Sequence, residues 1–257
     1  MLFLLLDALG GEYMKIYTVI SMFIVLVVYE YFSFSVGKPL ILPSGESILM
    51  EIFTIIRGTT FIEIISVTVV RTLVTFVCIL VLSLVVGILA GYYKVVAALL
   101  NPAMILLRTI PTVSLILILL IWFGRDLGPT IIVGLVIFPI IYELVVGSIK
   151  KVDSDLKDVC LLFGCTIFEK FFALYYPNLI YALSSGVQAT LGLAFKVMVM
   201  AEVMAQSRIG IGQALNYEKT YLNMAGVFGW TIILILIVMI FDFLISMIMK
   251  FLLRKLE

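Results

Sequence analysis

The most restrictive feature of the sequence is a run of 22 residues, 72–93, that contains no charged side chain. A helix that crosses the hydrocarbon core of a bilayer needs about 20 mainly apolar residues, so this run is long enough to span a membrane. Further segments of similar length and apolar content are residues 16–36, 97–123, 129–149, 178–205 and 226–249. The pattern predicts an all-α, polytopic membrane protein with six transmembrane helices.

The composition supports a membrane protein. Hydrophobic residues make up 64% of the 257-residue chain and charged residues only 13%, whereas soluble domains average about 45–50% apolar and about 25% charged residues. The chain therefore has too little polar surface to cover a water-soluble globule of this size. The formal net charge of +1 argues against nucleic acid as a partner, and membrane lipid is the expected surrounding.

Residue content also limits the chemistry of the chain. The sequence has no histidine, which excludes imidazole catalysis and histidine-ligated metals. Cys160 and Cys165 have C-x4-C spacing without a further cysteine or histidine partner, so we expect no metal site. The phosphate-binding loop G-x-x-x-x-G-K-[ST] is absent. We therefore expect no cofactor in this chain, and any ATP with its magnesium to be bound by another subunit.

Charge and proline placement divides the chain into three parts. Residues 1–65 contain a short leader (1–13), the first span and an external segment, in which residues 47–64 mix apolar and charged side chains as an interfacial amphipathic helix does. Residues 66–250 contain the other five spans and a long connection at 150–177, and residues 251–257 form a tail.

The distribution of lysine and arginine sets the expected orientation. Nine of these residues lie in connections on the side that holds both termini and the 150–177 connection, and five lie in connections on the other side. Because cytoplasmic loops carry the excess of positive charge, we expect both termini and the 150–177 connection in the cytoplasm.

The 150–177 connection is too apolar for a solvated linker. Its apolar residues crowd around Gly164, and two short helices that meet at this glycine would explain the pattern, since glycine accepts the positive φ of a sharp turn. Pro177 then stands in the first turn of the next helix, where proline is tolerated. The apolar cluster predicts either a docking surface for another protein or a helix pair that lies flat on the membrane.

The same connection resembles the cytoplasmic EAA motif of binding-protein-dependent ABC importer permeases. That motif reads Glu-Ala-Ala, three residues, Gly, nine residues, then Ile-x-Leu-Pro. The matching positions here are Asp158, Val159, Cys160, Gly164, Leu174 and Pro177. The glycine and the proline keep the family's separation, while the other positions carry substitutions, including Tyr176 where the family has leucine.

The resemblance extends from about residue 42 to the C-terminus. Residues 106–116, 185–204 and the Ile-Gly-Ile-Gly turn at 209–212 are similar to the nitrate, sulfonate and taurine branch of the family. That branch normally has an uncharged polar residue near the position of Glu143, so a carboxylate there is a departure.

This resemblance implies a type I ABC importer transmembrane domain at residues 66–250, in a multi-pass protein of the inner membrane of a prokaryote. In that family a permease pairs with a second permease chain, here expected to be an identical copy, around the translocation pathway. Two cytoplasmic ATP-binding subunits receive the coupling segment, and an extracytoplasmic protein delivers the substrate. The chain would be a transport subunit without an ATPase site, and the six motif positions would couple it to the ATPases.

The resemblance leaves the substrate open. Members of the branch are associated with small anions such as nitrate, sulfonates and taurine, and others with vitamin precursors, so either a small anion or an uncharged vitamin precursor fits. A secondary transporter or channel without an ATPase is the alternative outside the family. Such proteins often carry repeated discontinuous helices, and the sequence shows no convincing internal repeat.

Charged side chains inside the predicted spans need a reason, because each costs about 2.5–3.5 kcal/mol at mid-membrane on insertion scales. Arg71 lies at the outer mouth of the second span, where it can extend to the interface. Arg108 and Glu143 have similar expected depths and either form an ion pair or line the translocation pathway with Lys196 and Glu202. In the second case Arg108 and Lys196 would favour an anion.

Two prolines, Pro102 and Pro111, flank Arg108 in the third predicted span. Each removes a backbone donor and permits a bend. We predict a gating kink here, beside the pathway; the alternative is a passive bend of the kind that prolines also introduce elsewhere.

Overall fold

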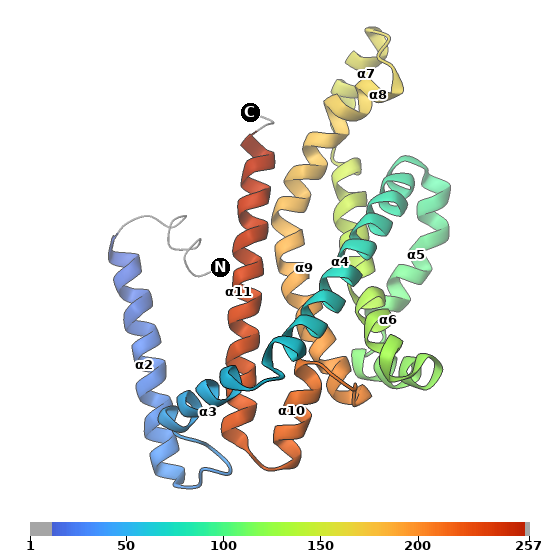
Figure 1. Ribbon diagram of the computed structural model, residues 1–257. Helices are drawn as coiled ribbons and strands as arrows, with labels where there is room; N and C mark the ends of the chain where they lie inside the picture. Colours follow the sequence, from blue (N-terminus) through green and yellow to red (C-terminus); the bar gives the residue numbers. More distant parts are fainter. Residues whose placement is uncertain (1–11, 255–257) are drawn as a thin grey trace.

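The computed structural model describes residues 12–254, and every regular element within them is helical, which confirms the all-α class. Figure 1 shows long helices standing alongside one another, with shorter helices at both ends. In chain order the elements are α2 (Glu12–Val36), α3 (Gly45–Arg57), α4 (Phe61–Tyr92), α5 (Lys94–Thr109), α6 (Thr112–Lys150), α7 (Ser154–Leu162), α8 (Ile167–Lys170), the π-helix η1 (Phe171–Tyr175), α9 (Tyr176–Ala205), α10 (Ile211–Thr220) and α11 (Met224–Arg254). Of the predicted leader, residues 1–11 lie outside the described residues.

Among the helices of residues 12–254, five are long and apolar enough to cross a membrane: α2, α4, α6, α9 and α11. Four of them contain the predicted spans 16–36, 129–149, 178–205 and 226–249, and α4 contains all but the last residue of the predicted span 72–93. The remaining predicted span, 97–123, is not one helix, because it is divided between α5 and the first part of α6. The sequence predicts a span that bends at Pro102 and Pro111, and the structure has a full break at Pro111.

The division lies at Pro111. Ile110 and Pro111 are both extended, with ψ of 126° and 127°. The ring of a proline disfavours the helical conformation of the preceding residue, so α5 has to end before Ile110 and α6 starts after the proline. Pro102 lies inside α5 and does not end it.

A second break, at Gly124, turns the chain back within α6. Gly124 has φ of 68° and ψ of −173°, a backbone conformation that side chains disfavour. The chain folds back so closely that a Cβ on Gly128 would lie 2.5 Å from Leu120 Cδ2. The first part of α6 therefore lies against the beginning of the second part, which contains the fourth predicted span.

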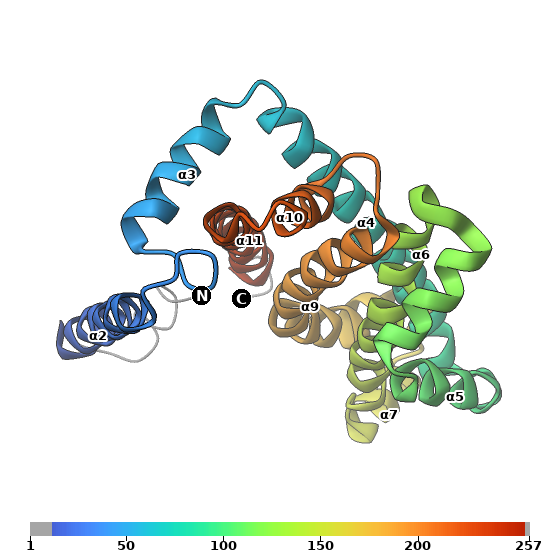
Figure 2. The same ribbon diagram turned by 90° about the horizontal axis from the view of Figure 1, so that it is seen from below.

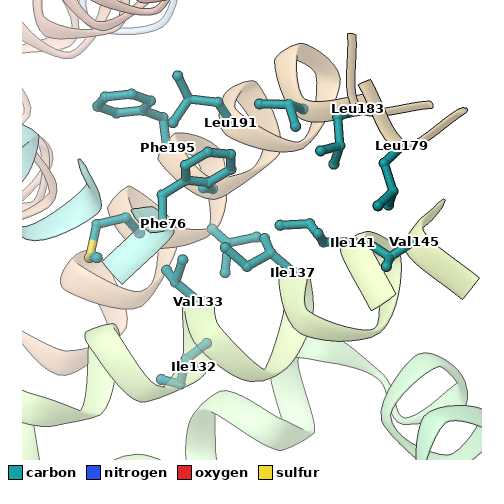
Figure 3. Packing of buried hydrophobic residues seen from close by; sticks show 14 of the residues in the cluster. Phe76, Ile132, Val133, Ile137, Ile141, Val145, Leu179, Leu183, Leu191 and Phe195 are labelled. Carbon is teal, nitrogen blue, oxygen red and sulfur yellow. The ribbon is translucent and has the colours of Figure 1, made fainter. Parts of the chain in front are cut away.

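The hydrophobic core lies where α4, the second part of α6, and α9 meet (Figure 3). Along α6, Ile137, Ile141 and Val145 are fully buried and recur every four residues, so they form one stripe on the helix. Leu191 and Phe195 of α9 lie in the same buried cluster. Interdigitation of these branched and aromatic side chains fixes the three helices as one unit.

Two glycines bring α4 and α6 close together. A Cβ on Gly87 would lie 2.8 Å from Val145 Cβ, and a Cβ on Gly91 would lie 2.7 Å from Ile149 Cβ. The two glycines are four residues apart, as are the two side chains that they receive, so the contact repeats along one turn of each helix. Small residues at this spacing allow helix backbones to approach in a membrane, where dispersion contacts drive association.

The amphipathic segment forms α3, which is shorter than predicted because residues 61–64 already belong to α4. Ser44 caps α3, and its hydroxyl accepts a hydrogen bond from the N–H of Ser47. Figure 2 shows α3 running along the edge of the molecule from α2 toward α4, past α11, with α2 at the periphery. Most described side chains of α2 are exposed apolar groups, which suits a helix surrounded by lipid.

The close α4–α6 contact predicts that Gly91→Ala destabilises the protein. The added methyl group would overlap Ile149, and overpacking of this kind costs about 1–3 kcal/mol. Thermal unfolding of the purified permease in detergent should show a lower Tm for Gly91→Ala. Gly147→Ala is the matched control, because a Cβ on Gly147 meets nothing within 4 Å. Equal Tm values for the two variants would contradict the packing account.

Candidate functional site

The connection between α6 and α9 turns sharply at Gly164, which has φ of 66°. The N–H of Cys165 donates to the carbonyl of Cys160 at 3.0 Å, and the N–H of Gly164 donates to the carbonyl of Leu161 at 3.2 Å. These two bonds form a Schellman motif, which satisfies carbonyls at the end of α7 and needs a left-handed residue at the glycine position. The two predicted helices on either side of Gly164 are α7 and α8.

The next helix begins two residues later with a capping box. The N–H of Thr166 donates to Glu169 Oε2 at 2.8 Å, and the N–H of Glu169 donates to Thr166 Oγ1 at 3.3 Å. This reciprocal pair satisfies donors at the start of α8. Because the Thr166 donors stabilise the ionised carboxylate, they lower the pKa of Glu169. The turn is therefore fixed by hydrogen bonds on both sides of Gly164.

The tip of this turn is exposed and apolar. Leu162 and Phe163 keep 85% and 83% of their surface exposed, and Leu161 and Phe168 are also exposed. In Figure 1, α7 and α8 project beyond the ends of the other helices. We call Leu161, Leu162, Phe163 and Phe168 the apolar tip. A fixed turn that presents large apolar side chains is a surface suited to contact with another protein.

The six positions that resemble the EAA motif surround this turn. Asp158 and Val159 are exposed on α7, while Cys160 and Leu174 are buried and belong to the main hydrophobic core. Gly164 makes the turn, and Pro177 lies in the first turn of α9, where the sequence predicts a helix start. The exposed and buried positions together link the apolar tip to the core.

A π-helix, η1, precedes Pro177. Within it the N–H of Tyr176 bonds to the carbonyl of Phe171, five residues back. Pro177 has no N–H, and in an α-helix its ring would crowd the carbonyl four residues earlier. The wider π turn changes the hydrogen-bond spacing immediately before the proline, so the chain stays helical from α8 into α9.

Arg108 and Glu143 contact each other across α5 and α6. Arg108 Nη1 donates to Glu143 Oε1, and both side chains are about half exposed, at 50% and 47%. Of the two predicted alternatives for Arg108 and Glu143, the structure therefore contains the ion pair. Since both groups remain open to the surface of the chain, the pair also leaves a polar patch on that side of the bundle.

The other predicted pathway residues have different surroundings. Lys196 is exposed on α9 and makes no ion pair within residues 12–254. Glu202, two turns further along α9, is wholly buried. The structure therefore does not bring Lys196 and Glu202 to one surface of this chain.

Glu202 is the centre of a buried polar network. Its carboxylate accepts hydrogen bonds from the Thr68 hydroxyl at 2.9 Å, from Arg71 Nη1 at 2.9 Å and from the N–H of Gly212 at 3.0 Å. The N–H of Ile211 donates to the Thr68 hydroxyl at 2.8 Å. One carboxylate thus joins α4, α9 and the start of α10. Arg71 therefore pairs with Glu202 inside the chain, whereas the sequence predicted that its side chain extends to the membrane interface.

Two glycines make room for this carboxylate. A Cβ on Gly210 would lie 2.6 Å from Glu202 Oε2, and a Cβ on Gly212 would lie 2.4 Å from Glu202 Cβ. The Ile-Gly-Ile-Gly turn therefore has a steric reason for both glycines. Sequence reasoning singled out this turn and Glu202 separately but missed their contact. Thr68, Arg71, Thr72 and Thr75 on one apolar helix were the available signal.

These features define a class of protein: a polytopic membrane permease with a helical core and an exposed turn that connects two core helices. The chain belongs to the family described as binding-protein-dependent transport system inner membrane component, which it matches over residues 83–257. The resemblance given by the sequence is confirmed.

Named relatives agree with this membership. A candidate ABC transporter permease of Methanocaldococcus jannaschii is 27% identical over 84% of this chain and 83% of its own length. A candidate aliphatic sulfonates transport permease of Bacillus subtilis is 25% identical, over 75% of this chain and 70% of its own. The formylaminopyrimidine transport permease of Halalkalibacterium halodurans is 24% identical, over 82% and 84%.

The fold is also similar to that of a solved transporter. A chain of the inward-facing MetNI methionine ABC transporter superposes with a TM-score of 0.56 at 19% identity, over 74% of this chain and 93% of that chain. The predicted type I ABC importer fold is thus confirmed.

The buried network predicts that Glu202→Gln lowers the stability of the protein. Breaking a fully buried ion pair by removing one partner costs about 3–5 kcal/mol. We expect a smaller loss, because the Arg71 side chain keeps 21% of its surface exposed. Thermal unfolding should show a lower Tm, and the double variant Glu202→Gln/Arg71→Gln should recover part of it. Glu63→Gln, an exposed acid of α4, is the control. No recovery in the double variant would argue against the pairing.

Proposed function

We propose that this ABC permease forms the translocation pathway of an importer and receives the motion that drives it through the α7–α8 turn. The observation that carries the proposal is the apolar tip, held on a turn that hydrogen bonds fix on both sides of Gly164. A rigid contact can transmit displacement to the helices that bear it, and these are α6 and α9 of the core.

The proposed assembly contains two copies of this chain, two cytoplasmic ATP-binding subunits and an extracytoplasmic substrate-binding protein. The ATP-binding subunits would hold ATP and magnesium, and this chain would contribute no ATPase site. The α7 end of the bundle would face the cytoplasm with both termini, and the α3–α10 end would face the binding protein. Lysines concentrated in the connections at the α7 end support this orientation.

For the substrate we propose a small anion such as a sulfonate. The sulfonate permease among the relatives supports this class, as does Lys196, an exposed cation on a core helix without an ion pair in residues 12–254. A second candidate is an uncharged vitamin precursor. The Arg108–Glu143 contact favours it, because the acid compensates the charge of the arginine. The formylaminopyrimidine permease supports the same class.

The coupling proposal predicts that two substitutions of Gly164 differ in their effect on transport. A Cβ at this position meets nothing within 4 Å, so any effect comes from the positive φ alone. Left-handed backbone costs L-residues about 1–2 kcal/mol, and asparagine tolerates it better than a β-branched residue does. Gly164→Val should reduce uptake and substrate-stimulated ATPase activity of the assembled transporter, whereas Gly164→Asn should stay close to the native protein.

Both variants must be inserted in the membrane at native levels for the comparison to count. Gly164→Val with normal uptake and normal assembly would contradict the role of the turn. Recovery of an active transporter without any ATP-binding subunit would instead support a secondary transporter or a channel.

A further inference from the structure

A cavity of about 550 Å³ lies at the α7 end, where α4 ends, α5 begins and the α7–α8 turn returns to the core. Four lysines from four helices line this cavity: Lys94, Lys150, Lys157 and Lys170. Two tyrosines, Tyr92 and Tyr175, line it as well. Of the residues that the structure describes, those lining the cavity include no acid. We call this the lysine pocket.

Within residues 12–254, no ion pair involves a lysine of this pocket. Ion pairs among residues 12–254 are Arg71–Glu202 and Arg108–Glu143, and neither lies in the pocket. Lys157 and Lys170 are partly buried there. Cations brought together without acids repel one another, and an anion that enters relieves the repulsion through charge-assisted hydrogen bonds.

The two tyrosines add neutral donors. Their rings lie 5.4 Å apart between centroids, and Tyr175 is buried. Burial first, and then the neighbouring Tyr92, raise the pKa of Tyr175 to about 12. Its hydroxyl therefore stays protonated at neutral pH, and it does not add a negative charge to the pocket.

The position of the pocket suits a ligand at the membrane surface. It lies where the apolar span α4 ends at Tyr92, and tyrosines are typical of the boundary between hydrocarbon and water. Its remaining walls are apolar or small, with Ala90, Gly91, Ala97 and Ile149. Basic pockets between transmembrane helices at such a boundary bind the head groups of anionic lipids.

We propose that the lysine pocket binds a phosphate group, supplied either by an anionic phospholipid or by free phosphate. Occupancy would join α4, α5, α6 and the α7–α8 turn through one anion. It would therefore stabilise the orientation of the turn relative to the core. This inference does not depend on which substrate the permease carries.

The test uses the permease purified with any ATP-binding subunit that accompanies it, in an uncharged detergent. Its Tm is measured with added phosphatidylglycerol, with phosphatidylcholine and with inorganic phosphate. A ligand that binds the native state raises Tm in a concentration-dependent way. The variant Lys94→Gln/Lys170→Gln removes two pocket cations. Lys151→Gln/Lys250→Gln, with two exposed lysines that do not line the pocket, is the control of equal charge.

We expect phosphatidylglycerol to raise Tm and phosphatidylcholine to have little effect. The pocket variant should bind phosphatidylglycerol about tenfold more weakly, and the control variant should bind it as the native chain does. A shift with phosphatidylglycerol alone identifies the lipid as the source. An equal shift with inorganic phosphate identifies the free anion, and the site itself is then confirmed.

Three results would overturn the proposal. The first is that neither phosphatidylglycerol nor inorganic phosphate shifts Tm. The second is an equal loss of the shift in the pocket and control variants, which would mean diffuse attraction to surface charge. The third is loss of the ATP-binding subunit from the pocket variant without any lipid effect, which would assign the lysines to a protein contact.

Discussion

Backbone groups inside a bilayer have no water to bond, so a chain that crosses it repeatedly must satisfy them within its own helices. Wherever the chain departs from regular helix, the residues at the break have to accommodate it. The breaks at Pro111 and Gly124 and the turn at Gly164 are made by residues suited to them, a proline or a glycine in left-handed conformation. At Gly164 the carbonyls that the turn would leave free are bonded by the N–H groups of the next residues. The architecture thus depends on the long helices and on the positions at which they are broken.

The α7–α8 turn is connected on both sides to the main hydrophobic core. It leaves α6 and returns through η1 to α9, and these two helices contribute most of the buried residues of the core. Cys160 and Leu174 belong to that core, whereas Leu162 and Phe163 extend away from it. A displacement applied to the apolar tip would therefore reach α6 and α9 directly. At the opposite end, Glu202 joins α9 to α4 and α10, so the same helix is held at both ends by specific contacts.

Much of this architecture could be predicted from the sequence, because apolar runs of span length and lysine-rich connections are local signals. The helix pair around Gly164 followed from the conformational preferences of glycine. At Pro177 the predicted helix start is a change of helix type, because the π-helix η1 leads into α9 without a break. The sequence could not show that Pro111 ends a helix whereas Pro102 does not, since tertiary packing decides which proline is tolerated. It also could not show that Arg71 reaches Glu202, because 131 residues separate them and only the fold brings them to 2.9 Å. The close approach of Gly87 and Gly91 to α6 likewise depends on which helices are neighbours.

The central claim is that the apolar tip is the cytoplasmic contact with an ATP-binding subunit. The most direct measurement is the labelling of Phe163→Cys by a membrane-impermeant maleimide, in a chain whose Cys78, Cys160 and Cys165 are replaced by serine. The account predicts labelling in inside-out vesicles stripped of the ATP-binding subunit, protection when that subunit is restored, and no labelling in right-side-out vesicles. Labelling from the outer face, or labelling that the restored subunit leaves unchanged, would contradict it.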